Sequence, residues 1–162
     1  MSLDVDPSAA GSPQSSPRFD VSDLDGFELL SGAERDEVFM DTERQIRSLQ
    51  ATQALRLHRV GRCGSHFDDG HKTAKIWHRR ITNGSPATSR QQALLGDMLT
   101  ALPVIAEAAV AGDLGADQLR LLSGLYANPR ARDQLAGWWE HKLLEFARTR
   151  VLSDFDLSLI HI

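Results

Sequence analysis

The stretch Ser31–Val60, SGAERDEVFMDTERQIRSLQATQALRLHRV, is the clearest helix in the sequence and decides its fold class. Ser31, followed three residues later by Glu34, is a capping box, in which each side chain bonds the backbone N–H of the other residue. Acidic side chains at 34, 36 and 37 suit the positive end of the helix dipole. Apolar residues then recur at helical spacing, which predicts a helix that ends at Gly61. These residues are Val38, Phe39, Ile46, Leu49, Ala54, Leu55 and Leu57.

Helix starts and stops recur through the rest of the chain. Ser or Asn before Pro marks helix starts, and Gly after an apolar run marks helix ends. Aromatic residues make up only 6% of the chain and Val and Ile form no long runs, so strands are disfavoured. The sequence therefore predicts an all-α fold, a multi-helix array or bundle. The later helices are expected over residues 72–81, from Ser85-Pro86 through Leu99, over 104–111, over 116–127, and from Asn128-Pro129 through Ala147 with a kink near Gly137.

The N-terminal part of the chain has a different composition from the helical part. Residues 1–22 are rich in Ser and Pro and cannot bury enough apolar surface to offset the entropy of ordering them, so a disordered tail is expected. The acidic, partly apolar stretch Phe19–Leu30 fits either a small helix or a docking strip. The helical domain itself is expected over residues 23–156.

The last six residues, Leu157–Ile162, read as the translation of CTG TCT CTT ATA CAC ATC, the start of a transposon end used in sequencing libraries. The preceding Ser153–Asp156 looks like a helix start with no helix after it. We therefore expect residues 157–162 to be a non-native tail, and the natural protein to continue beyond Asp156.

The overall composition indicates the cellular setting. The 162 residues are 41% hydrophobic and 25% charged, as in ordinary globular domains. No stretch approaches the roughly 20 apolar residues that cross a bilayer, and the N-terminus lacks the regions of a secretory signal. Cys63 is the only cysteine, so no intrachain disulfide can form. These features predict a cytoplasmic protein without a membrane partner.

Several short runs follow one another along the chain: Asp69–Trp77, Leu102-Pro103, Val110–Gly115, Ala127–Arg130, and Leu143-Leu144 followed by Ser153–Phe155. In this order they resemble the landmarks of one known family, the actinobacterial domain of unknown function 222, also called the 13E12 repeat family. The resemblance covers roughly residues 34–156. The family commonly lies N-terminal to an HNH endonuclease domain, and it has no established catalytic residues to carry over. The resemblance therefore implies an accessory helical domain, with the nuclease and its divalent metal in a part of the protein beyond this chain.

The chain itself carries no complete catalytic or metal site. An HNH centre needs a His base, a metal-binding His or Asp and a positioning Asn on a hairpin, and no such pattern is present. Cys63 and His66 have zinc-ligand spacing, and His71 and His78 follow, but a solvated Gly-rich loop is the favoured interpretation because structural zinc usually takes two such pairs. Asp68-Asp69 is interpreted as a helix cap. We expect no catalytic residue, cofactor or small-molecule substrate in this chain, whereas the full-length protein could be an HNH endonuclease.

Basic residues are concentrated in the middle of the chain. Residues 46–90 carry nine basic and two acidic side chains, a net charge of +7, whereas residues 1–45 carry −8 and residues 91–162 carry −3. Lys72, Lys75 and Arg79 are spaced to share a helix face, which could neutralise phosphates with salt-dependent affinity. The helices around Asn83-Gly84 could form a helix-turn-helix-like pair. The predicted nucleic-acid-binding residues are Arg56, Arg59, Arg62, His71, Lys72, Lys75, His78, Arg79 and Arg80.

Two functions from different classes follow from these features. The first is an accessory domain of an HNH endonuclease that contacts DNA through its basic central region and is not catalytic by itself. The second is a protein-interaction or oligomerisation module without nucleic-acid binding, in which the acidic strip Asp20–Glu37 meets a basic partner or residues 56–80 of another copy. In the second case the basic side chains only solvate helix faces or pair with the acidic N-terminus.

Overall fold

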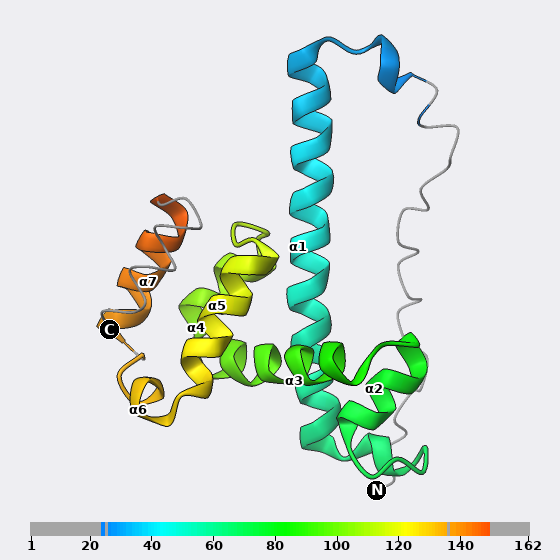
Figure 1. Cartoon of the computed structure of the whole chain (residues 1–162), viewed down its shortest axis with the longest axis vertical. Coiled ribbons are helices and arrows are strands. Elements are labelled where there is room, and N and C mark those ends of the chain that lie inside the picture. The colour runs from blue at the N-terminus through cyan, green and yellow to red at the C-terminus, as the bar shows by residue number, and fades with distance from the viewer. Residues whose placement is uncertain (1–23, 25, 136, 150–162) are drawn as a thin grey trace, which may run out of the picture. The chain divides into compact units, whose positions relative to one another are not determined.

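The computed structural model describes residues 24, 26–135 and 137–149 (Figure 1). The described residues contain helices and connections and no strand, which confirms the predicted all-α, multi-helix architecture. They belong to two compact units, one ending at Val38 and one beginning at Phe39. The predicted disordered tail, residues 1–22, and the predicted non-native tail, residues 157–162, lie outside the described residues.

The first unit contains the 3-10 helix η3 (Phe27–Leu29) and the start of α1 (Gly32–Cys63). The Ser31 N–H donates to Glu34 Oε2 at 2.8 Å, and the Glu34 N–H donates to Ser31 Oγ at 3.3 Å. The predicted capping box is therefore confirmed. Its hydrogen bonds, chiefly from the Ser31 backbone, lower the pKa of the Glu34 carboxyl group.

The end of α1 differs from the prediction. Gly61 lies within the helix, and α1 continues to Cys63. Gly64, with φ +76°, follows the helix and its N–H donates to the Val60 carbonyl at 3.1 Å. A helix can pass through a glycine at modest cost, whereas the left-handed backbone at Gly64 ends it. The short 3-10 helix η4 (Ser65–Phe67) then begins the connection to α2.

Helix α2 (Ala74–Thr82) starts two residues later than expected. The Thr73 hydroxyl is the cap that accepts the Ile76 N–H at 3.2 Å, so the predicted capping role of Asp68-Asp69 is wrong. Asp69 instead accepts the indole N–H of Trp77 at 2.8 Å. Asn83, with φ 51°, ends α2 as predicted.

Up to residue 132, the next helices begin and end close to the start and end signals predicted from the sequence. Helix α3 (Pro86–Ala101) begins at its Ser85 cap, and α4 (Pro103–Val110) and α5 (Ala116–Ala127) follow. The expected sixth helix is wrong, because it is two helices, α6 (Pro129–Arg132) and α7 (Trp138–Thr149). Gly137, with φ +73°, immediately precedes α7 and lies where the kink was expected. No single described helix is long and apolar enough to span a bilayer, although α3 and α4, bent by 119°, have the length and composition when taken together.

Helix α3 crosses α1 within the second unit (Figure 1). A Cβ at Gly96 would collide with the Ala54 carbonyl oxygen, so the two helices are in close backbone contact there. The His58 ring Nδ1 lies 2.8 Å from Asp97 Oδ1 beside this crossing. The small residue at 96 thus fixes where the long helix and α3 meet.

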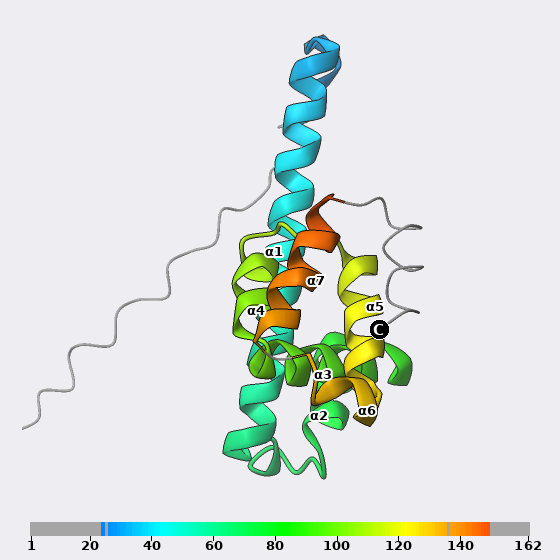
Figure 2. The same cartoon turned by 90° about the vertical axis from the view of Figure 1, so that its left-hand side faces the viewer.

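Helices α4, α5 and α7 form a cluster that continues the core beyond α3 (Figure 2). The buried carboxylate of Glu140 on α7 caps α4, accepting the Val104 N–H at 2.6 Å and the Ile105 N–H at 3.0 Å. It replaces the side-chain cap that Leu102 cannot supply. The largest fully buried apolar side chains are Met98, Leu99, Ile105, Leu114, Leu122, Leu135 and Leu143.

Several apolar side chains that the periodicity predicted to pack are exposed. In the second unit, Phe39, Ile46 and Leu49 of α1 are 67%, 45% and 68% exposed. Ile76 and Ile81 of α2, expected to supply apolar contacts, are 39% and 58% exposed. Their helical spacing was predicted correctly, but burial also needs a packing partner, and these side chains remain open to solvent.

Candidate nucleic-acid interface

Helix α2 is held against two other helices, which fixes the positions of its basic side chains. The His78 ring Nδ1 lies 3.0 Å from the hydroxyl of Ser89 on α3, and both side chains are buried. At the start of α2, a Cβ at Gly61 of α1 would lie 3.6 Å from Ala74 Cβ, an ordinary packing distance. The backbone of α2 is therefore anchored at its first residue and at its middle.

Three of the predicted residues, His71, Arg79 and Arg80, line one open hollow of about 530 Å³. The hollow also includes Asn83 and Gly84, which connect α2 to α3. Arg79 and Arg80 are exposed, and His71 is half-buried. The hollow therefore presents cations beside the α2–α3 connection.

Two more predicted residues, Arg62 and Lys75, line a second hollow of about 230 Å³ where α1, α2 and α3 meet. Both side chains are exposed. Asp97 lies at the same hollow beside His58, so its carboxylate partly offsets the positive charge there. Lys75 and Arg79 are four residues apart on α2, which brings the two hollows onto neighbouring parts of one surface.

The other predicted residues are placed differently. Lys72 precedes α2, so the expected helical stripe of Lys72, Lys75 and Arg79 is only partly formed. Arg56 and Arg59 are exposed on α1 but line neither hollow.

His78 is 3% exposed and is not available to a ligand at the surface. Burial lowers the pKa of its imidazole, because desolvation disfavours the charged form. Placing His78 among the nucleic-acid contacts was therefore wrong. Its spacing from His71 suggested a shared face, but packing against Ser89 turns His78 inward.

Ion pairing divides the described basic side chains into two groups. Among the described residues, none of the exposed predicted cations has an acidic partner within 4.0 Å. In contrast, Arg47, Arg120, Lys142 and Arg148 each pair with a carboxylate. The predicted cations without such a partner are Arg56, Arg59, Arg62, Lys72, Lys75, Arg79 and Arg80. Outside the predicted set, Arg35, Arg44, Arg90, Arg130 and Arg132 also lack one among the described residues.

The residues with zinc-ligand spacing are engaged in local contacts. The Cys63 thiol lies 3.3 Å from Ser65 Oγ, and this hydrogen bonding lowers the pKa of the thiol. The buried His66 has its Nδ1 3.3 Å from the Val60 carbonyl oxygen. Within the described part of the chain, no group of three or more His, Cys, Asp or Glu side chains is arranged to hold a metal ion.

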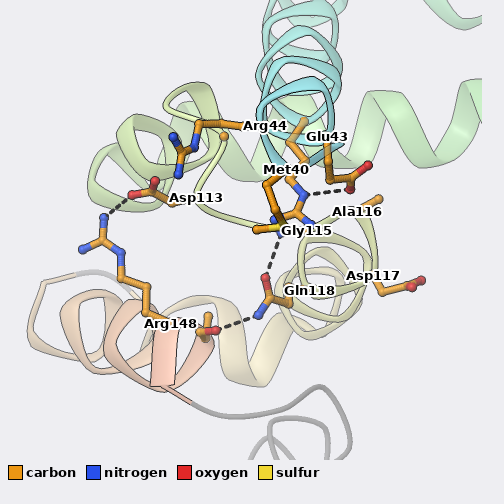
Figure 3. A pocket seen from close by; sticks show the side chains of 12 residues that line it. Met40, Glu43, Arg44, Asp113, Gly115, Ala116, Asp117, Gln118 and Arg148 are labelled. Carbon is orange, nitrogen blue, oxygen red and sulfur yellow. Dashed lines mark hydrogen bonds and ion pairs between the residues drawn. The ribbon is translucent and has the colours of Figure 1, made fainter. Parts of the chain in front are cut away.

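A larger hollow, of about 710 Å³, lies between α1, the α4–α5 connection and α7 (Figure 3). Its charges are largely matched: Arg148 pairs with Asp113 at 2.6 Å, and Arg47 pairs with Glu43 at 2.8 Å. Gln118 accepts the Gly115 N–H and donates to the Ala147 carbonyl. The Arg148–Asp113 and Gln118–Ala147 contacts join segments far apart in the sequence and have no local sequence signal. The other two contacts are local, three or four residues apart. Together, these contacts account for the polar lining without a ligand.

The sequence and the fold were also compared with known proteins. No family model matches the chain, and no curated protein or solved structure matches it either.

Proposed function

We propose that this chain is an accessory helical module that binds the phosphate backbone of nucleic acid and has no catalytic role of its own. The surface concerned is formed by Arg62, Lys75, Arg79 and Arg80, which we name the α2 basic surface. The observation that carries the proposal is that these cations are exposed, anchored on packed helices and without acidic partners among the described residues.

The physical basis is counterion release. A protein that neutralises phosphates with Lys and Arg frees condensed cations, so its affinity falls as salt concentration rises. Cations already paired with carboxylates contribute little to such binding, because a phosphate must compete with the existing partner. The α2 basic surface has no such competition within the described chain, apart from Asp97 near Lys75.

The resemblance to the domain that precedes HNH nucleases agrees with this proposal. A nuclease whose metal and base lie elsewhere in the protein gains from a helical module that holds the substrate backbone close by. In that arrangement this chain contributes affinity, and the HNH part contributes the divalent metal and the cleavage.

The test replaces two cations of the surface and measures binding to duplex DNA across a salt series. Arg79→Gln/Arg80→Gln should weaken binding at low salt about tenfold or more, and should reduce the slope of log affinity against log salt by about 2. The matched control, Arg35→Gln/Arg130→Gln, removes two exposed arginines elsewhere and should change both quantities little. A wild-type chain that does not bind DNA, or equal losses in the two variants, would refute the proposal.

A protein-interaction module is the second candidate function. It is favoured by the exposed apolar side chains Phe39, Ile46 and Leu49 on α1. Light scattering separates the two candidates, since a concentration-dependent dimer that does not bind DNA would support the second.

A further inference from the structure

The connection between α2 and α3 is short and conformationally fixed. Three residues, 83–85, join the nine-residue α2 to α3. Asn83 takes the left-handed conformation, and the Gly84 N–H donates to the Arg79 carbonyl at 3.1 Å. Ser85 then caps α3 by accepting the Thr88 N–H at 3.0 Å, with Pro86 at the first helical position. Two helices joined by such a turn, with Gly in it, have the form of a helix-turn-helix unit.

Helix α1 supplies the third, supporting helix of this unit. It contacts α3 at Gly96 and lies beside α2 at Ala74, while His78 and Ser89 join α2 to α3. Each pair of the three helices is thus in contact. A rigid three-helix scaffold is the arrangement that lets helix-turn-helix proteins insert one helix into a groove.

The side chains at the start of α3 divide into an inward and an outward set. Ser89 is buried, and the half-buried Gln91 donates from Nε2 to Ser123 Oγ at 2.8 Å. Ala87, Thr88 and Arg90 are exposed, and Arg90 has no acidic partner within 4.0 Å among the described residues. The Thr88 hydroxyl lies 2.9 Å from Ser85 Oγ, so the outward set presents chiefly the Arg90 guanidinium and the methyl groups of Ala87 and Thr88. Arginine and methyl groups are among those that contact base edges in the major groove.

We infer that the unit formed by α2, its three-residue turn and α3 recognises the base sequence of duplex DNA. Arg79 and Arg80, at the hollow beside the turn, hold the backbone. Arg90 and its exposed neighbours then reach the base edges of the adjacent major groove. This inference rests on the proposed function, because the α2 basic surface supplies the backbone contacts.

The geometry favours duplex DNA over duplex RNA. The B-form major groove admits an α-helix, whereas the A-form major groove is too deep and narrow for side chains to read. Helix α1 crosses α3 at Gly96, and Asp97 carries a negative charge beside the crossing. Contact with DNA is therefore confined to the first turns of α3.

The experiment begins with selection from a library of random duplex DNA by the wild-type chain. We expect an enriched sequence that contains a guanine, because Arg pairs with two acceptors on its major-groove edge. Arg90→Ala should reduce discrimination against a substituted guanine by about 5- to 100-fold, with smaller loss on unrelated sequences. Arg79→Gln/Arg80→Gln should weaken binding to all sequences alike. Arg130→Ala is the matched control, and the melting temperature of each variant verifies its fold.

The possible outcomes separate this inference from the proposed function. Two results would overturn the inference that α3 recognises bases in the major groove: binding to duplex DNA without an enriched sequence, or a sequence preference that is unchanged in Arg90→Ala. Either result would leave the proposed binding to the phosphate backbone intact. Equal affinity for RNA and DNA duplexes of matched sequence would also overturn the inference. A chain that binds neither duplex at low salt would remove the proposed function and this inference together.

Discussion

Two stretches of α1, residues 39–50 and residues 51–63, share one helical geometry and have opposite exposure. In the first, Phe39, Ile46 and Leu49 are exposed. In the second, Ala51, Ala54 and Leu57 are 0%, 0% and 3% exposed. The first stretch therefore exposes large apolar side chains, whereas the second buries mainly small ones.

The close approach of α3 explains why small residues are buried. Gly96 of α3 lies against the Ala54 backbone, and only small side chains leave room for such a contact. In residues 39–50, the corresponding close contact is made by a loop. A Cβ at Gly112, which has φ +81°, would collide with the Arg44 carbonyl oxygen. That contact covers the side of α1 that carries Arg44 and leaves Phe39, Ile46 and Leu49 exposed.

The comparison shows what helical periodicity establishes. Apolar residues at a 3.6-residue spacing predict a helix, and both stretches are helical. Burial also requires a partner element, and the sequence of α1 alone does not say where its partners lie. Exposed apolar side chains on one side of a helix are typical of an interaction surface.

The largest expected effect comes from truncating one leucine in each of the two stretches and comparing the losses of stability. Leu57→Ala should lower the free energy of unfolding by about 2–4 kcal/mol, because it removes buried contacts and leaves a cavity. Leu49→Ala should change it by less than about 0.5 kcal/mol, because Leu49 is 68% exposed. Urea unfolding followed by circular dichroism measures both. A similar loss in both variants would show that Leu49 packs against a partner in solution.

The second prediction tests the crossing itself with a pair of glycines, each inside a helix. Gly96→Ala should destabilise the chain by about 1–3 kcal/mol, because the added methyl group forces α3 away from Ala54. A Cβ at Gly124 of α5 would meet nothing within 4 Å, so Gly124→Ala should stabilise by up to about 1 kcal/mol through helix propensity. Thermal unfolding of both variants provides the measurement. Changes of the same sign would contradict the close crossing.

Local signals in the sequence predicted most helix boundaries. The Ser31–Glu34 capping box, the Ser85-Pro86 start and the bounds of α5 are as expected, because each depends on residues within a few positions. The prediction that the first helix ends at Gly61 was wrong, because glycine permits a helix to end but does not require it. The single sixth helix was wrong as well, because α6 ends at Arg132 and α7 begins only at Trp138, directly after Gly137, where a kink was expected.

Such local signals could not predict long-range contacts. The Glu140 cap joins α7 to the start of α4 at Val104, 36 residues away in the sequence. No sequence pattern near either residue predicts this contact. The candidate site was partly foreseen, because charge asymmetry identified the basic stretch. The sequence could not show that His78 faces Ser89 or that Thr73 caps α2 and leaves Lys72 outside the helix. Both outcomes depend on how α2 packs.

The smallest expected effect concerns pH and again distinguishes the packed part of the chain from residues 39–50, where no described side chain is buried. His78 is buried, and its folded-state pKa lies below the ordinary value of 6.5. Between the two pKa values the unfolded chain binds a proton that the folded chain does not. The contribution of neutral His78 to the free energy of unfolding is therefore fully present above pH 6.5 and is lost as the pH falls below that value. We expect unfolding free energy to decrease by less than about 1 kcal/mol between about pH 7.5 and about pH 5.5 from this group.

The variant His78→Asn isolates this contribution, because its amide can still reach the Ser89 hydroxyl but does not titrate. Its stability should depend less on pH than that of the wild type, whereas His141→Asn, at an exposed position, leaves the buried imidazole in place and serves as the control. Urea unfolding at the two pH values measures the difference. If His78→Asn retained the full wild-type pH dependence, the burial of a neutral imidazole between α2 and α3 would not be its source. A reduced dependence in His78→Asn alone would instead locate the pH sensitivity at the contact that holds α2, and with it Arg79 and Arg80, against α3.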